Sequence, residues 1–142
     1  MRVVIVSGGF DPIHSGHIEH FKAAKKLGDI LIVGLNSDEW LTRKKGKPFL
    51  PLEERLAVVK SMRPVDSAVP FNDDNDSSID LIKKTLVLFD DVIFANGGDR
   101  TQDNIPEIYE FDKDPRVQFA FGVGGTHKQN SSSWILKKWN ST

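Results

Sequence analysis

A chain of 142 residues has the length of one ordinary domain, and its 39% hydrophobic and 27% charged residues are typical of a globular fold. The net charge of −1 gives no overall attraction to nucleic acid or to an anionic membrane surface, so any basic site must be local. Because cysteine is absent, disulfides, thiolate metal sites and a cysteine nucleophile are excluded.

Met1 leads directly into the strand-like "RVVIVS", without the charged and apolar segments of a signal peptide. No apolar run approaches the roughly 20 residues that span a bilayer. We therefore expect a cytoplasmic protein of one domain, residues 1–142, with no nucleic-acid partner and no membrane partner.

Short apolar runs alternate with helical patterns along the chain. Strands are predicted over residues 3–6, 30–35, 65–71, 91–95 and 117–121. Helices are predicted over residues 17–28, 51–62 and 77–89, with weaker patterns over 105–112 and 132–139. The first two strands are continuously apolar, as parallel strands covered on both faces are. The chain is therefore predicted to be an α/β protein with a doubly wound, parallel, five-stranded Rossmann-like sheet of order 3-2-1-4-5 and helices on both faces.

Four local features add predictions of their own. Gly28 suits the C-cap of the first helix, and Ser77 or Ser78 suits the N-cap of the third. The acids of "NDDNDSS", residues 72–78, are expected to be solvated turn residues rather than metal ligands. The basic segment "RKKGK", residues 43–47, is predicted to be a flexible loop after a helix candidate.

The segment "GGFDPIHSGH", residues 8–17, joins the first strand to the first helix and holds two of the four histidines, His14 and His17. Gly8 and Gly9 permit a close approach of the backbone to a ligand, and the helix start that follows attracts anions. With the predicted strand order, "NGGDR", residues 96–100, opens into the same crevice.

Three interpretations of this segment are open. It is a phosphate site in which both histidines donate hydrogen bonds, a structural zinc site completed by His20, His127 or carboxylates, or a helix-capping loop that accommodates the rings. The phosphate site is favoured because it accounts for the glycines, the proline and the helix start together. A dinucleotide-dependent oxidoreductase is disfavoured because G-x-G-x-x-G does not occur.

With these motifs the chain resembles the cytidylyltransferase-like nucleotidyltransferases, whose signature H-x-G-H stands here in "GGFDPIHSGHI". Further motifs resemble the heptose-phosphate adenylyltransferase and glycerol-phosphate cytidylyltransferase branches, namely "AAKKLGDILIVGLNSDEW", "RKKGKPFLPLEERLAVV", "VDSAVPF" and "NGGDR". The resemblance extends from about residue 2 to residue 100, with a weaker match at "NSSSWIL".

This resemblance implies an enzyme that transfers CMP or AMP from CTP or ATP to a phosphorylated alcohol or sugar and releases pyrophosphate, with Mg²⁺ on the triphosphate. It implies catalytic roles for His14, His17 and Lys45, and substrate contacts for Asp38 and Arg100. The implied nucleotide site consists of Gly8, Gly9, Phe10, Asp11, His14, His17, Lys44, Lys47, Gly98, Asp99, Ser131, Ser132 and Ser133. No protein ligand is assigned to the metal, and a homodimer is expected because relatives commonly form two-fold dimers.

The chain departs from the family pattern at two places. Gln129 and Asn130 stand where the family usually has an arginine before the serine-rich helix start, and Lys128 or a C-terminal lysine is the available replacement. Arg100 stands where several relatives carry an aromatic residue. CTP and ATP both stay open as donors, as do heptose, glycerol, ribitol and choline phosphates as acceptors. An inactive nucleotide-binding or regulatory module is the alternative function, but the histidine pair and the lysines that such a module would lose are present.

Overall fold

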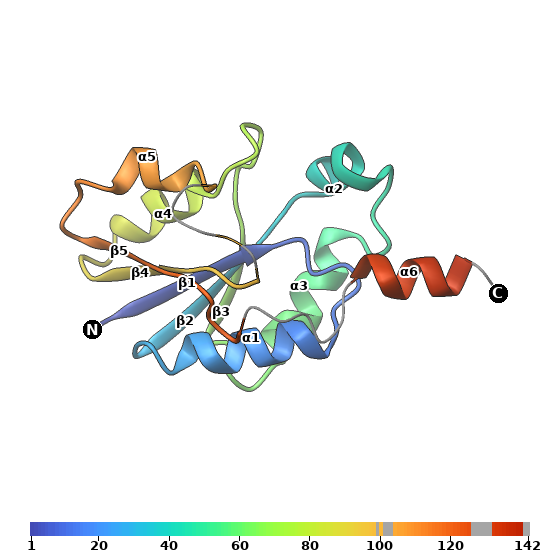
Figure 1. Cartoon of the computed structure of the whole chain (residues 1–142), viewed down its shortest axis with the longest axis horizontal. Helices are drawn as coiled ribbons and strands as arrows, with labels where there is room; N and C mark the ends of the chain where they lie inside the picture. The colour runs from blue at the N-terminus through green and yellow to red at the C-terminus, as the bar shows by residue number, and fades with distance from the viewer. Residues whose placement is uncertain (99, 101–103, 126–131, 141–142) are drawn as a thin grey trace.

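In the described part of the chain, five parallel strands form the central sheet, in the order β3-β2-β1-β4-β5 (Figure 1). The strands are β1 (Val3–Gly8), β2 (Ile30–Leu35), β3 (Ser67–Pro70), β4 (Val92–Ala95) and β5 (Val117–Ala120). The computed structural model describes residues 1–98, 100, 104–125 and 132–140. Both the predicted α/β class and the predicted strand order are confirmed.

The described residues also form six helices. They are α1 (Ser15–Lys25), α2 (Asp38–Lys45), α3 (Leu52–Lys60), α4 (Ile79–Leu86), α5 (Glu107–Phe111) and α6 (Ser132–Asn140). Each predicted helix overlaps one of them. A membrane-spanning helix is absent from the described residues, since every helix there is too short or too polar to cross a bilayer.

Helix α2 extends into the basic segment that was predicted to be a flexible loop. Its first residue follows the N-cap Ser37, whose Oγ accepts a hydrogen bond from the backbone N–H of Trp40 at 3.0 Å. Its last residue, Lys45, is followed by the C-cap Gly46, which has a φ of 95°. Acidic residues stand in its first turn and the cations of 43–45 in its last turn, where both complement the helix dipole. The loop prediction was therefore wrong for residues 43–45, since caps and charges favour helix there.

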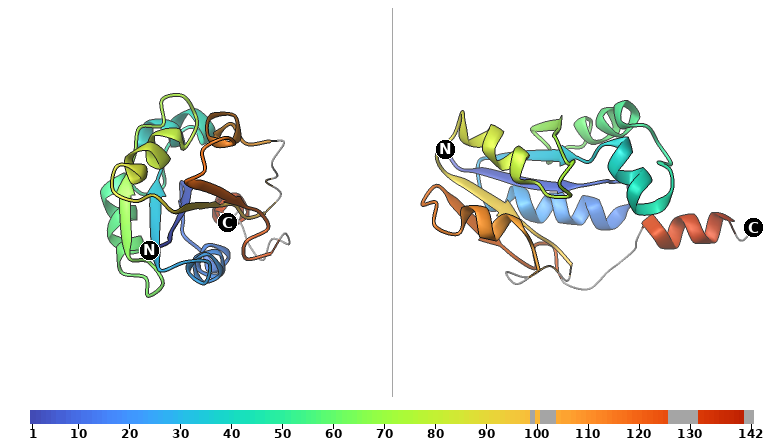
Figure 2. Two further views of the ribbon diagram at one scale, coloured as in Figure 1. Left: turned by 90° about the vertical axis from the view of Figure 1, so that its left-hand side faces the viewer. Right: turned by 90° about the horizontal axis from the view of Figure 1, so that it is seen from above.

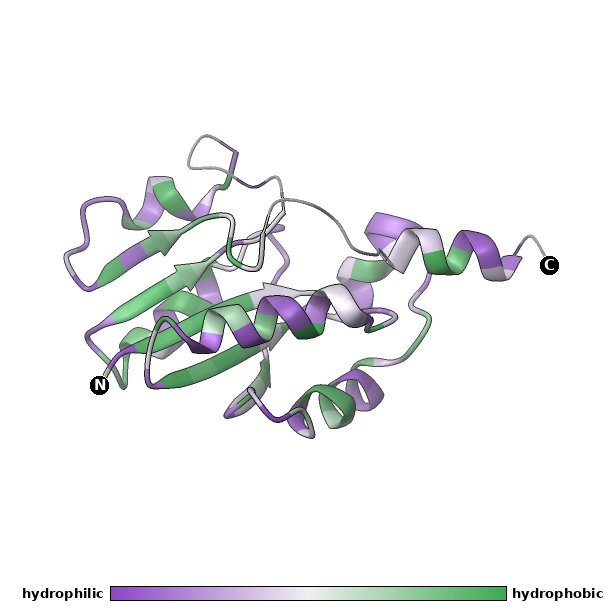
Figure 3. Cartoon of the chain, turned by 60° about the horizontal axis from the view of Figure 1, so that its bottom comes forward, coloured by the Kyte–Doolittle hydropathy of each residue, from purple (hydrophilic) through white to green (hydrophobic). Residues whose placement is uncertain are grey.

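The side chains of β1 alternate between two buried clusters, one on each face of the sheet. Val4 belongs to one cluster with Phe21 of α1 and Val59 of α3, whereas Ile5 belongs to the other with Leu81 of α4 and Phe111 of α5. The helices accordingly cover both faces (Figure 2), and the strands between them are mostly hydrophobic (Figure 3). Burial on two faces is the reason why the first strands are continuously apolar.

Gly28 and Gly34 mark places where two elements approach closely. Helix α1 has its C-cap at Lys26, so the prediction that Gly28 caps it was wrong. A Cβ on Gly28 would lie 2.9 Å from the carbonyl oxygen of Arg2, and a Cβ on Gly34 would lie 2.3 Å from a methyl group of Leu81. These glycines therefore let the chain pass the start of β1 and let α4 pack on β2.

The strands β1 and β4 are neighbours in the sheet, with Val3 beside Val92 and Ile5 beside Phe94. Helix α1, between β1 and β2, and helix α4, between β3 and β4, pack on opposite faces of the sheet. The pair of β1 and β4 therefore marks the point where the winding of the sheet reverses. The loops that follow β1 and β4 leave the sheet at the same edge, as predicted.

Candidate active site

The loop after β1 begins with two glycines that its own packing requires. Phe10 is buried with a φ of 51°, and a Cβ on Gly8 would lie 2.9 Å from the tip of its ring. A Cβ on Gly9 would lie 2.9 Å from a methyl group of Leu41. The Phe10 ring packs edge-on against the imidazole of His17, with the ring centroids 4.9 Å apart. Close packing therefore explains the glycines, in addition to the ligand access inferred from the sequence.

His14 and His17 cap the first turn of α1 reciprocally. The Nδ1 atom of His14 accepts a hydrogen bond from the backbone N–H of Gly16 at 3.0 Å, and the Nδ1 atom of His17 accepts one from the N–H of His14 at 3.2 Å. The two rings stack with their centroids 3.8 Å apart. An imidazole nitrogen that accepts a hydrogen bond carries no proton, so in each neutral ring the proton is on Nε2. Each ring therefore has an Nε2–H that it can donate to a ligand.

Burial keeps these histidines neutral. Burial, together with the smaller effects of the neighbouring His14, His20 and Lys45, lowers the pKa of His17 to about 3. Burial also lowers the pKa of His14 and of His20. The Nδ1–H of His20 donates to the carbonyl oxygen of Val123 at 2.8 Å, which joins α1 to the chain after β5. At neutral pH the pair thus offers neutral donors rather than positive charges.

A cavity of about 450 Å³ opens beside the histidine pair and extends to the loop after β4. This volume is in the range of small-molecule sites. Nine residues predicted for the site line it, namely Gly8, Gly9, Phe10, His14, His17, Lys44, Gly98, Arg100 and Ser132. His20 and Asn96 line it as well, although the sequence analysis did not assign them to the nucleotide.

The remaining predicted site residues either do not line this cavity or lie outside the described residues. Asp11, Asp38, Lys45, Lys47 and Ser133 are not among the described residues that line this cavity. Asp99 and Ser131 lie outside the described residues.

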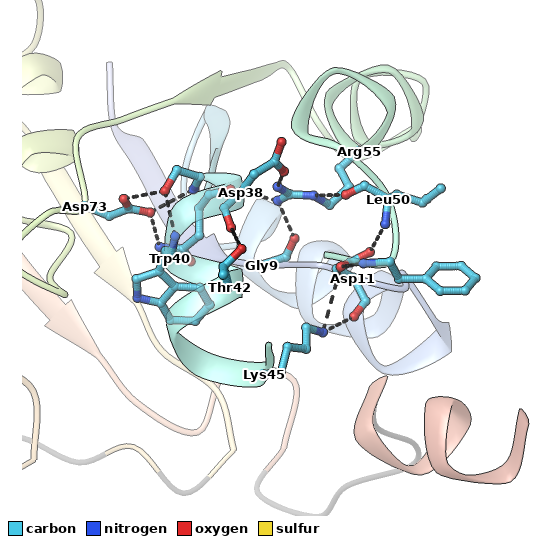
Figure 4. A network of polar contacts seen from close by, with 12 residues as sticks. Gly9, Asp11, Asp38, Trp40, Thr42, Lys45, Leu50, Arg55 and Asp73 are labelled. Atoms are coloured by element: carbon cyan, nitrogen blue, oxygen red, sulfur yellow. Dashed lines mark hydrogen bonds and ion pairs between the residues drawn. The ribbon is translucent and has the colours of Figure 1, made fainter. Parts of the chain in front are cut away.

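Asp11 and Lys45 fasten the segment after α2 to the β1–α1 loop. The carboxylate of Asp11 is buried and accepts hydrogen bonds from the backbone N–H groups of Phe49 at 2.6 Å and Leu50 at 2.8 Å (Figure 4). The amino group of Lys45 donates to the carbonyl oxygen of Asp11, and burial lowers the pKa of this lysine. Lys44, one residue earlier on α2, reaches the cavity that the sequence analysis had assigned chiefly to Lys45.

Arg55 of α3 is a buried arginine that the sequence analysis missed. Its guanidinium donates to the carbonyl oxygens of Gly9 at 3.0 Å and Asn36 at 2.8 Å, and to Oδ1 of Asp38 at 2.7 Å (Figure 4). This ion pair occupies Asp38, the predicted substrate contact. The sequence does hold a signal for its burial, because Arg55 lies on the apolar stripe of α3, one residue before Leu56.

Asp73 is the second polar residue whose burial the sequence analysis missed. It was expected to be a solvated turn residue, but it is only 2% exposed. Its carboxylate accepts hydrogen bonds from the side-chain amide of Asn36 at 3.0 Å and from the N–H and Oγ–H of Ser37 at 2.8 and 2.7 Å. Burial alone would raise the pKa of Asp73, but these hydrogen bonds outweigh it and lower the pKa. Asp73 therefore orients the turn between β2 and α2.

A second cavity, of about 670 Å³, adjoins the first. The two share part of their lining, namely Ser7, Gly8, Gly9, Lys44 and Arg100. The rest of its lining includes Asn36, Trp40, Arg43, Asp76, Ser77, Ser78, Asn104, Pro106 and Glu107. A ligand in one cavity would therefore lie next to a ligand in the other, beside the cations that both share.

A family model described as cytidylyltransferase-like matches residues 5–138, which include both loops and both cavities. The chain belongs to the cytidylyltransferase-like family. The family predicted from the motifs is thus confirmed, and the predicted class of enzyme, a nucleotidyltransferase, agrees with it.

Relatives with known names support the same assignment. The cytidylyltransferase-like chain is 35% identical over 134 residues to the bifunctional protein HldE of Photorhabdus laumondii subsp. laumondii, and 33% identical over 142 residues to that of Geobacter sulfurreducens. These matches cover 89% and 97% of this chain but 27% and 28% of the relatives, so the chain spans about a quarter of their length. The lipopolysaccharide core biosynthesis protein from Thermoplasma volcanium GSS1 has a similar structure, with a TM-score of 0.67 and 27% identity, over 85% of this chain and 95% of that one.

The cytidylyltransferase-like site was also weighed as a zinc site in the sequence analysis. Among the described residues, no three histidine, aspartate or glutamate side chains converge as metal ligands. His127, one of the ligands considered, lies outside the described residues. The described part of the site therefore gives no support to a protein-held metal.

Proposed function

We propose that this chain transfers a nucleoside monophosphate from CTP or ATP to a phosphorylated alcohol or sugar, with release of pyrophosphate. The observation that carries the proposal is the pair of neutral imidazoles, His14 and His17, which offer Nε2–H donors at the first turn of α1 beside a cavity. The N-terminus of a helix has free backbone N–H groups and favours anions, so the same place suits a phosphate.

In the proposed reaction, an oxygen of the acceptor's phosphate attacks the α-phosphorus of the nucleotide. A P–O bond forms to that oxygen, the bond from the α-phosphorus to the oxygen bridging to the β-phosphorus breaks, and pyrophosphate leaves with the electron pair. The acceptor phosphate is already anionic, so neither a protein nucleophile nor a strong base is needed. The barrier arises from bringing two anions together and from the charge that moves onto pyrophosphate, and fixed hydrogen-bond donors lower it.

The histidines and the basic segment divide this work. His14 and His17 donate to the α-phosphate and to the bridging oxygen. Lys44, which lines both cavities, neutralises the triphosphate, and Lys45 and Lys47 of the same segment add to that charge when nucleotide binds.

In this proposal the loop after β4 contacts the nucleotide through Gly98 and the acceptor through Arg100, and the start of α6 contacts the nucleotide. Gly98 and Arg100 line the first cavity, and Ser132 lines it while its Oγ–H donates to the carbonyl oxygen of Pro12 at 2.7 Å. Asp99 and Ser131, which lie outside the described residues, are proposed as nucleotide contacts on their motifs alone.

Mg²⁺ is proposed as the partner of the triphosphate. When bound there, it would offset the negative charge of the phosphate oxygens. Mg²⁺ typically keeps several waters and takes its other ligands from the phosphates. No protein ligand is assigned to it.

A pyrophosphate-release assay tests the proposal directly. The purified chain is incubated with Mg²⁺ and each of four nucleoside triphosphates, against heptose, glycerol, ribitol and choline phosphates. We expect release that requires both one nucleotide and one phosphorylated acceptor, with ATP and CTP as the candidate donors. Nucleotide binding without release across this panel would contradict the proposal and favour an inactive nucleotide-binding module.

A further inference from the structure

His20 of α1 is a half-buried histidine to which the proposed reaction gives no role. It lies one turn after His17 and lines the first cavity. The loops after β4 and β5 hold its ring, since Nδ1 is hydrogen-bonded to the carbonyl oxygen of Val123 at 2.8 Å and a Cβ on Gly97 would lie 3.0 Å from the same nitrogen. A Cβ on Gly124 would lie 3.0 Å from the Cα atom of His20. The ring therefore has a fixed orientation in the cavity wall.

The tautomer of His20 is opposite to that of the histidine pair. A carbonyl oxygen only accepts hydrogen bonds, so Nδ1 of His20 carries the proton and Nε2 of the neutral ring has a free lone pair. Burial, with a smaller contribution from Arg100, lowers the pKa of His20 and outweighs the opposing effect of the hydrogen bond to Val123. At neutral pH His20 thus brings an acceptor to a cavity in which His14 and His17 are donors.

This acceptor does not suit a phosphate. Phosphate oxygens are acceptors themselves, and a lone pair repels them, so the ligand group at Nε2 of His20 must be a donor. A nucleotide offers two kinds of donor, the hydroxyl groups of its ribose and the exocyclic amino group of adenine or cytosine. His20 therefore faces the nucleoside rather than the triphosphate.

The strand order fixes the direction in which the nucleotide lies. Lys44, which neutralises the triphosphate in the proposed function, belongs to α2 after β2, on one side of β1. His20 contacts the loops after β4 and β5, on the other side of β1. A nucleotide with its α-phosphate at the end of β1 and its terminal phosphates towards Lys44 thus has its nucleoside towards His20.

The ribose is the part of the nucleoside that matches this position. His17 and His20 are three residues apart, so they share one face of α1 and are separated by about 4.5 Å along its axis. With the α-phosphate at His17, His20 lies one short step further along the nucleotide, and the ribose is the unit bonded to the α-phosphate. Gly98 and Gly125 leave room there, since a Cβ on either would meet no atom of the described residues within 4 Å.

We propose that Nε2 of His20 accepts a hydrogen bond from a ribose hydroxyl group of the nucleotide, so that His20 selects ribonucleotides over analogues that lack this hydroxyl. The inference rests on the proposed nucleotidyl transfer and adds a specificity-determining residue to its nucleotide site.

Glu19 is a competing acceptor, because it precedes His20 on α1 and lines the same cavity. Its carboxylate is half-exposed and lies 3.5 Å from the amino group of Lys22. Water and this lysine already satisfy the carboxylate, whereas the lone pair of His20 faces a more enclosed place. Glu19→Gln is accordingly the matched control for substitutions of His20.

Two near-isosteric substitutions separate the two contacts of the His20 ring. In His20→Asn the amide nitrogen takes the place of Nδ1, so the donor to Val123 is kept and the acceptor at Nε2 is lost. In His20→Gln the longer side chain brings an amide oxygen to the place of Nε2, so an acceptor is kept and the bond to Val123 is lost. A merely structural role predicts that the asparagine is the better replacement, and a specificity role predicts that the glutamine is.

Equilibrium binding of ATP and CTP with Mg²⁺ is compared with binding of their 2′-deoxy and 3′-deoxy analogues. For the wild type we expect one of the two deoxy positions to raise Kd about 3- to 10-fold, as the loss of one hydrogen bond does. His20→Asn should bind the ribonucleotide and that deoxy analogue equally, at the affinity of the wild type for the analogue. His20→Gln should retain part of the discrimination, and Glu19→Gln should retain all of it.

Three results would overturn the inference. They are equal wild-type Kd values for the ribonucleotide and both deoxy analogues, unchanged ribose discrimination in His20→Asn, and loss of that discrimination in Glu19→Gln. If His20→Asn instead abolishes a preference for ATP over ITP, Nε2 faces the amino group of the base, and the assignment to the ribose is wrong.

The ¹⁵N NMR spectrum of the wild-type imidazoles tests the same claim even where a variant does not fold. We expect His20 to show a protonated Nδ1 and an unprotonated Nε2, and the Nε2 resonance to shift more with the ribonucleotide than with the sensitive deoxy analogue. A protonated Nε2 at neutral pH would overturn the inference. Ribose discrimination in a chain that releases no pyrophosphate would contradict the proposed function alone, so the two failures are distinguishable.

Discussion

Arg55 donates a hydrogen bond from Nη1 to the carbonyl oxygen of Gly9 at 3.0 Å. The same nitrogen donates to the carbonyl oxygen of Asn36 at 2.8 Å, and Nη2 bonds Asp38. One guanidinium therefore holds the loop after β1 and the turn after β2 in a fixed relation. Because these segments line both cavities, Arg55 positions the site without touching a ligand there.

Arg55→Lys is expected to lower the free energy of unfolding by about 3 kcal/mol. Lysine reaches fewer of these acceptors and leaves buried carbonyl groups unpaired. The rate per folded molecule is also expected to fall, since the loop of His14 and His17 loses its support. Urea unfolding and single-turnover assays measure the two effects.

The matched control for this prediction is Arg116→Lys. Arg116 is an exposed arginine of the turn before β5, where it pairs with Asp114. Its replacement is expected to leave both stability and rate unchanged. Wild-type stability and rate in Arg55→Lys would contradict the positioning role.

The layers of this fold were predictable because they depend on local patterns. Continuous apolar runs identified β1 and β2, and the glycine- and histidine-containing loop indicated the candidate site, where it lines a cavity. The burial of Arg55, Asp73 and Glu107 was not predictable, because each becomes buried only through partners distant in the chain. Which lysine of the basic segment lines the cavity was not predictable, because the segment was expected to be a loop, in which side-chain direction has no helical period.

Acid is expected to destabilise the fold through His17. Its pKa is 6.5 in the unfolded chain and about 3 in the folded one, so between these values the unfolded state binds the proton and the folded state does not. Stability is therefore full above pH 6.5 and decreases as the pH falls through the window towards 3. At pH 5 the loss from this residue is about 2 kcal/mol.

Urea unfolding of the wild type and of His17→Asn from pH 7 to pH 5 checks this prediction. Asparagine does not titrate, so the variant is expected to lose less stability over the same interval. A variant with the same pH slope as the wild type would show that other groups, such as His20, account for the dependence.

Nucleotide is expected to protect the end of α2 from trypsin. The cations of 43–45 repel one another in the last turn of α2, and a triphosphate would neutralise them and close the segment over the site. Cleavage after Lys44 and Lys45 should slow several-fold with ATP or CTP and Mg²⁺, whereas cleavage after the exposed Lys26 should not change. Equal cleavage at both places with and without nucleotide would count against closure.

A two-fold dimer is expected in solution, on the basis of the resemblance to the family and of the usual isologous pairing of identical chains. Helix α6 carries Trp139, which is 71% exposed, and is the first surface to test. Light scattering at micromolar concentration should give twice the monomer mass of 15.9 kDa. A monomer mass would reject this prediction, and loss of the dimer in Trp139→Ser would assign it to α6.

The transition-state role of His17 is the central claim, and the single-turnover rate of His17→Ala tests it most directly. The loss of one fixed donor to the bridging oxygen is expected to slow the chemical step about 10²–10³-fold. Nucleotide Kd should change little, because this donor acts mainly in the transition state, and thermal melting of the same preparation counts the folded molecules. A folded His17→Ala protein that retains the wild-type rate would contradict the mechanism.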